Sequence, residues 1–117
     1  MDTTNLTDLI DQQLTLAGQG DTSGRSARTL HGGKGNALRQ TVVVMLAGHR
    51  MDEHLSPGEA TLLLLAGSVR VHTADRQIDV GEGDFIVLPR ERHSVDALED
   101  TAFLLTVIKP LGHGYSE

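Results

Sequence analysis

Hydrophobic and polar positions follow two different periods along the chain, and the change of period divides it into two parts. Between residues 4 and 17, apolar side chains recur at intervals of three and four, which predicts a short amphipathic helix. Thr4 or Asn5 would cap its start, and Asp8 in the first turn would interact favourably with the helix dipole. Residues 18–27 are rich in glycine, serine and aspartate and show no period, which indicates a connector.

After this helix and connector, residues 1–27, the pattern is that of short strands. The run from Leu38 to Gly48 is β-branched and almost continuously apolar, as is typical of a strand covered on both faces. Apolar and polar residues alternate on both sides of residues 73–76, which predicts a β-hairpin. Pro89 would end another strand, because proline cannot donate a hydrogen bond to a ladder. Further strands are expected at residues 28–30, 62–65, 85–88 and 101–109.

Seven or eight such strands without helices between them predict an all-β fold, an antiparallel sandwich or barrel over residues 28–117. The chain has 117 residues and fits one domain with a single core. Its 16 acidic and 10 basic residues give a net charge of −6, which argues against binding nucleic acid or an anionic membrane.

The absence of cysteine from the sequence excludes disulfides, a zinc ribbon and a thiol nucleophile. The sequence also lacks a nucleophile-elbow motif, a phosphate-binding glycine loop and paired-carboxylate spacing. It has neither a signal-like start nor an apolar run of membrane length, so we expect a cytoplasmic protein.

Two stretches carry the candidate chemistry. In the first, residues 48–67, His54 precedes a Pro-Gly turn and Glu59; in the second, residues 83–95, His93 follows an apolar strand. Imidazole and carboxylate groups that meet in one pocket would suit a divalent cation. We therefore expect His54 and His93, which are distant along the chain, to converge inside one β scaffold.

These stretches resemble the two motifs of the RmlC-like cupin superfamily, whose fold is the double-stranded β-helix, or jelly roll. The second motif matches in order, with one residue fewer between its proline and its histidine. The resemblance covers roughly residues 38–109 and implies a cupin barrel; more narrowly, the chain looks like the small single-domain cupins of bacteria. The matching residues are Gly48, His54 and Gly67 in the first motif and Gly83, Pro89 and His93 in the second.

The chain departs from the motifs at the metal ligands. A cupin metal site uses three histidines and a glutamate, but here Ser56 replaces one histidine and Ala60 occupies the glutamate position. The resemblance implies at most His54, His93 and Glu59 as ligands, for iron, zinc, manganese or nickel. Because strand side chains alternate, Glu59 would turn away from the pocket unless a bulge after the Pro-Gly turn redirects it. The sequence leaves both orientations open.

Two further residues are candidates for the pocket. Ser56 would hold a water or a substrate oxygen, or else satisfy the turn. Arg39 interrupts an apolar strand; pointing inward it would bind a carboxylate ligand, and pointing outward it would solubilise an edge. The run Leu62–Leu65 is apolar on both faces, which together with the N-terminal helix favours a homodimer.

Three functions are compatible with these residues. The first is a small cupin that binds a small molecule in its barrel pocket, with or without a divalent metal. The second is a metal-dependent cupin enzyme, a dioxygenase or an isomerase/lyase, with His54 and His93 as ligands. The third is a metal-free, epimerase-like enzyme in which a pocket histidine acts as general base near neutral pH.

Overall fold

The computed structural model describes residues 1–20, 24–54 and 58–109, with residues 53 and 54 described by their backbone alone. Ser56 therefore lies outside the described residues. One helix, α1 (Leu6–Ala17), precedes the strands of this part of the chain. They are β1 (Arg25–His31), β2 (Leu38–Met45), β3 (Arg50–His54), β4 (Ala60–Ala66), β5 (Ser68–His72), β6 (Gln77–Gly81), β7 (Phe85–Val87), β8 (His93–Ala97) and β9 (Thr101–Ile108).

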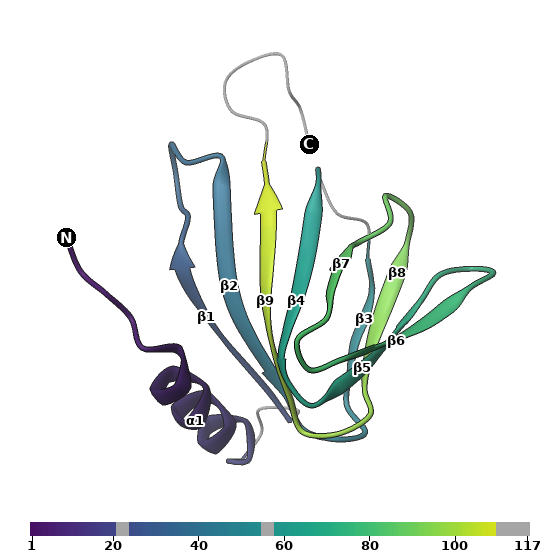
Figure 1. The fold of residues 1–117 in the computed structure, drawn as a ribbon, viewed down its shortest axis with the longest axis horizontal. Helices are drawn as coiled ribbons and strands as arrows, with labels where there is room; N and C mark the ends of the chain where they lie inside the picture. Colours follow the sequence, from purple (N-terminus) through teal and green to yellow (C-terminus); the bar gives the residue numbers. More distant parts are fainter. Residues whose placement is uncertain (21–23, 55–57, 110–117) are drawn as a thin grey trace.

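The strands form two antiparallel sheets that pack face to face (Figure 1). Sheet A has the order β1-β2-β9-β4-β7, and sheet B has the order β3-β8-β5-β6. Alternate residues of each strand point into the space between the sheets, where Met45 and Phe103 of sheet A meet Val69 and Val95 of sheet B. The predicted all-β architecture with a short N-terminal helix is confirmed.

Helix α1 covers the outer face of sheet A on the β1 and β2 side (Figure 1). Its start is capped by Asn5, whose side-chain oxygen accepts a hydrogen bond from the Asp8 backbone N–H at 3.0 Å. Leu9 packs in one buried cluster with Val42 and Val44 of β2, while the alternate β2 residues face sheet B. The helix therefore explains why β2 is apolar on both faces.

The hairpin and the strands expected near residues 38–48, 62–65, 85–88 and 101–109 are confirmed, the latter as β2, β4, β7 and β9, whereas the start of β1 and all of β8 were missed. Strands β5 and β6 join through residues 73–76, where the Thr73 backbone N–H donates to the Arg76 carbonyl at 2.8 Å. Strand β1 begins at Arg25, inside the expected connector, and β8 was not expected at all. The described residues therefore form nine strands, more than the seven or eight expected. Strands β1 and β8 form because they pair with β2 and β5, and not because of a local apolar pattern.

Gly67 carries the chain from sheet A to sheet B between β4 and β5. Its φ of +77° lies in the left-handed region, which disfavours any side chain. A Cβ placed there would also overlap the carbonyl oxygen of Asp100. The crossing between sheets at this point thus requires glycine, the residue that ends the first of the two motifs.

On the outer face of sheet A, beyond the helix, Phe85 and Val87 are each 62% exposed. They extend the apolar outer face of β4, which was one of the two reasons for expecting a homodimer. The homodimer stays a prediction. No helix within residues 1–20, 24–54 and 58–109 is long and apolar enough to cross a membrane.

Candidate functional site

His93 is the first residue of β8 and is fully buried. Its Nδ1 lies 2.9 Å from the carbonyl oxygen of Glu91. Because a carbonyl only accepts, Nδ1 carries the hydrogen, and in the neutral ring the lone pair resides on Nε2. A backbone hydrogen bond of this kind fixes the orientation of metal-ligating and general-base histidines alike.

His54 ends β3, and the backbone register pairs it directly with His93 across the β3–β8 ladder. A register shift between Met51 and His54 marks a β-bulge just before this pair. The fold thus brings two residues that are distant in sequence to facing positions of one ladder. The convergence of their two rings stays a prediction, since the His54 side chain lies outside the described part.

Glu59 lies on the surface rather than beside His93. Its side chain is 72% exposed, and its Oε1 is 3.6 Å from a guanidinium nitrogen of Arg90. The reason is strand alternation: β4 starts at Ala60, which is buried in the core, so the preceding side chain turns outward. Among the described side chains, no group of three or more histidine, aspartate or glutamate residues is arranged to hold a metal ion.

A cavity of about 550 Å³ opens between the two sheets along β1 and β2. Strand β1 is the edge of sheet A, and its inward-facing Ala27 remains exposed. Arg39 is one of the lining residues, so its side chain is on the inner side of β2. The lining residues are Arg25, Ser26, Ala27, Arg39, Thr41, Val43, Met51 and Leu105.

Arg25 was missed by the sequence reasoning, which placed it in the connector. Its signal was weak, because β1 reads as a polar strand whose alternation is visible only once it is paired with β2.

A second cavity, of about 300 Å³, opens on the opposite side of the sandwich beside Ile78 and Ile86. Its arginine, Arg76, lies 3.5 Å from the carboxylate of Glu91, so the charge there is already compensated.

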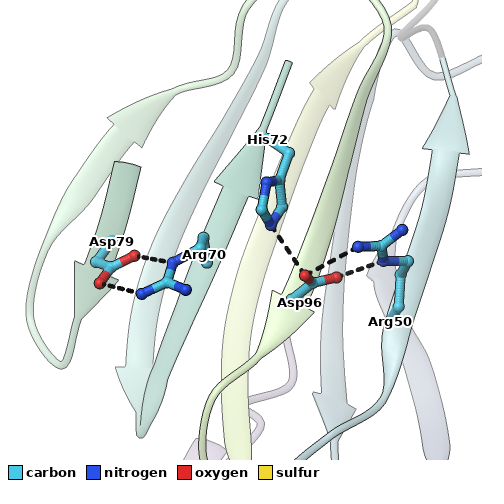
Figure 2. Close-up of polar contacts among 5 residues, drawn as sticks. All are labelled: Arg50, Arg70, His72, Asp79 and Asp96. Atoms are coloured by element: carbon cyan, nitrogen blue, oxygen red, sulfur yellow. Dashed lines mark hydrogen bonds and ion pairs between the residues drawn. The ribbon is translucent and has the colours of Figure 1, made fainter. Parts of the chain in front are cut away.

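The outer face of sheet B carries a polar network that the sequence did not reveal (Figure 2). Asp96 of β8 accepts hydrogen bonds from Arg50 of β3, at 2.5 and 3.1 Å, and from His72 of β5, at 2.9 Å. Beside it, Arg70 of β5 pairs with Asp79 of β6 through two hydrogen bonds. Arg50, and to a smaller extent His72, holds the pKa of Asp96 below its usual value despite partial burial.

This network predicts a pH-dependent contribution to stability. Because the native pKa of Asp96 is lowered, its contribution is present above the unfolded pKa of about 4 and is lost as the pH falls below it. We expect Asp96→Asn to lower the free energy of unfolding by about 1–2 kcal/mol at pH 7, with a smaller difference at pH 3. Urea unfolding at both pH values measures it.

The matched control is Asp79→Asn, which removes an exposed carboxylate from the same sheet face. We expect a smaller change from this variant, because exposed ion pairs are screened by water. If the difference in free energy of unfolding between the wild type and Asp96→Asn is the same at both pH values, the pKa of Asp96 does not change on folding.

Comparisons with known proteins agree with this architecture. A family model described as "Cupin domain" matches residues 41–109. Among solved structures, a conserved protein of unknown function from Streptococcus pyogenes is 30% identical, with 79% of this chain and 80% of that chain covered and a TM-score of 0.69. An RmlC-like cupin protein from Desulfovibrio desulfuricans is 22% identical, with 95% and 99% covered and a TM-score of 0.72.

A third similar structure is an enzyme. Salicylate 1,2-dioxygenase from Pseudaminobacter salicylatoxidans is 18% identical over 86% of this chain and 33% of that chain, with a TM-score of 0.72. At this identity the likeness shows the shared fold alone. The comparison with curated proteins found no match.

Proposed function

The chain belongs to the cupin domain family, and on that premise we propose that it binds a small molecule in the cavity between its two sheets. The observation that carries this proposal is the cavity itself. Its volume of about 550 Å³ falls within the roughly 300–1,000 Å³ typical of small-molecule sites. Its lining combines aliphatic side chains such as Val43 and Leu105 with polar groups such as Thr41 and Arg39, a mixture that both buries and orients a ligand.

A thermal-shift screen of the purified, untagged protein against small organic molecules tests this proposal. A ligand that binds only the folded protein raises the melting temperature, and the rise keeps growing with the logarithm of the ligand concentration above its dissociation constant. We expect Ala27→Phe, which fills the cavity from the edge strand, to abolish the shift. The matched control, Ala74→Phe in the exposed β5–β6 turn, should retain it. Hits that bind Ala27→Phe as tightly as the wild type would place the ligand elsewhere and overturn the proposal.

The alternative function is a metal-dependent enzyme, a dioxygenase or an isomerase/lyase. Two observations favour it: the backbone pairing of His54 with His93, and the Nδ1 hydrogen bond that leaves Nε2 of His93 as the ring's lone-pair atom. A similar structure is also an enzyme named as a dioxygenase. The described side chains do not complete a ligand set, because Glu59 pairs with Arg90, so no chemical step is assigned to a metal.

Elemental analysis of the untagged protein separates the two functions. The enzyme alternative requires iron, zinc, manganese or nickel at about one ion per chain, lost in the His54→Ala/His93→Ala double variant. Because His93 is fully buried, circular dichroism must show that this variant remains folded, and His54→Ala alone serves as the second readout. Protein that binds ligand at full occupancy without any of these metals would favour the binding function.

A further inference from the structure

We propose that the ligand of the inter-sheet cavity is an elongated aliphatic dianion, a dicarboxylate with one carboxylate bound near Arg25 and the other near Arg39. This inference rests on the proposed function, because it names the chemical class of the molecule bound at that site. Three features of the cavity carry it: the charge of its lining, the separation of its two arginines, and the character of the surface between them.

The charge of the lining is positive although the protein as a whole is acidic. The chain carries a net charge of −6, yet two arginines and no acidic residue are among the described residues that line the cavity. Within the described residues, neither arginine lies within 4.0 Å of a carboxylate. Four others do form such contacts: Arg50, Arg70, Arg76 and Arg90. Uncompensated guanidinium groups in a concave site attract anions, and their planar fork matches a carboxylate in particular.

The two arginines lie at opposite ends of the β1–β2 ladder. Arg25 pairs with Met45, whereas Arg39 is near the other end of β2. Residues 39 and 45 are separated by about 20 Å of antiparallel strand. A single small carboxylate therefore cannot engage both arginines closely, whereas an elongated molecule with an acid at each end can.

Both arginines are exposed to solvent, and each lies beside a neighbouring segment of the chain. The stem of Arg39 rests against the β1–β2 hairpin, where a Cβ on Gly32 would stand 3.1 Å from the Arg39 Cγ. Arg25 reaches across toward sheet B, where one of its terminal nitrogens is 3.5 Å from the backbone carbonyl oxygen of Arg50. A guanidinium group has five N–H donors, so this contact leaves donors of Arg25 for a ligand.

The surface between the two arginines is aliphatic. Ala27, Val43, Met51 and Leu105 line it, and the lining residues found in the described part of the chain include no aromatic side chain. The hydroxyl of Thr41, which also faces the cavity, is 3.3 Å from that of Thr29. This surface fits a chain of methylene groups better than an aromatic ring, which would find no stacking partner.

Isothermal titration calorimetry with a length series of dicarboxylates tests the inference. The probes are succinate, adipate, suberate and sebacate, with octanoate and suberamide as the single-charge and uncharged counterparts of suberate. We expect affinity to rise to an optimum length and octanoate to bind about tenfold more weakly than the best dicarboxylate, since it lacks one charged contact. Suberamide should not bind measurably.

Variants of the two arginines test whether each one binds a carboxylate of the ligand. Arg25→Gln and Arg39→Gln should each weaken binding of the best dicarboxylate about tenfold and reduce it to the level of octanoate. The matched control is Arg28→Gln, which makes the same change on β1 but lies at the crevice beside α1. Thermal melts check that all three variants fold as the wild type does.

The outcomes distinguish this inference from the function on which it rests. If octanoate binds as tightly as every dicarboxylate, or if Arg28→Gln weakens binding as much as the other two variants, the dianion inference is wrong. If neutral molecules from the thermal-shift screen bind and no carboxylate does, the inference is also wrong while the proposed function stands. If nothing binds in the cavity, both fail.

Discussion

Replacing Phe103 with alanine is expected to lower the free energy of unfolding by about 3–5 kcal/mol. Phe103 is the largest of the fully buried side chains and projects from β9 into the space between the sheets. Its strand neighbours in sheet A are Val43 and Leu64, which face the same core. Removing the ring leaves a cavity that sheets fixed by hydrogen bonding on both sides of β9 can fill only in part.

Urea unfolding followed by circular dichroism measures this loss. The expected loss is a large share of the roughly 5–15 kcal/mol that is typical for the free energy of unfolding of a domain, so the variant should unfold at a much lower denaturant concentration. Phe103→Leu is the control, because it keeps most of the apolar volume and should cost distinctly less. A loss below about 1 kcal/mol for Phe103→Ala would mean that the two sheets are not packed against each other at this point.

Replacing Gly67 with alanine is the second large effect, with an expected loss of about 2–5 kcal/mol. Two costs combine: an alanine at φ of +77° is strained by about 1–2 kcal/mol, and its Cβ collides with the carbonyl oxygen of Asp100. The two backbone segments cannot easily move apart, because Thr101, which follows Asp100, donates a hydrogen bond from its hydroxyl to the carbonyl of Ala66, which precedes Gly67, at 2.8 Å.

Gly83→Ala separates the two costs. Gly83 has a φ of +86°, close to that of Gly67, but a Cβ there would meet no atom within 4 Å. It should therefore show only the backbone strain, about 1 kcal/mol after the smaller entropy of the unfolded alanine chain is included. Equal losses for the two variants, measured by the same urea titration, would refute the collision at the sheet crossing.

The sequence predicted the elements whose residues repeat with a clear period. The helix was visible because its apolar residues recur every three or four positions, and the β5–β6 hairpin because Val69 and Val71 mirror Ile78 and Val80. Strand β8 was missed because its sequence, HSVDA, mixes polar and apolar residues. Its burial comes from lying between β3 and β5, a fact of topology that no local pattern contains.

The candidate site was also predictable only in part, because the sequence motifs identify residues but not the register of the strands that carry them. The motif resemblance identified His54 and His93, and the fold pairs them in register. The orientation of Glu59 depended on where β4 begins, to within one residue, and sequence boundaries are not that accurate. The group formed by Arg50, His72 and Asp96 comes from three strands, so it becomes visible only when the register of sheet B is known (Figure 2).

Strand β9 pairs with β2 on one side and β4 on the other, at the centre of sheet A (Figure 1). The ribosome releases it after every other strand in the described part of the chain. Until then β2 and β4 have no neighbour on their shared side, and their unsatisfied backbone groups are open to other chains. Folding of this domain is therefore expected to finish only after translation of residues 101–108, and nascent chains stalled before that segment should be sensitive to protease.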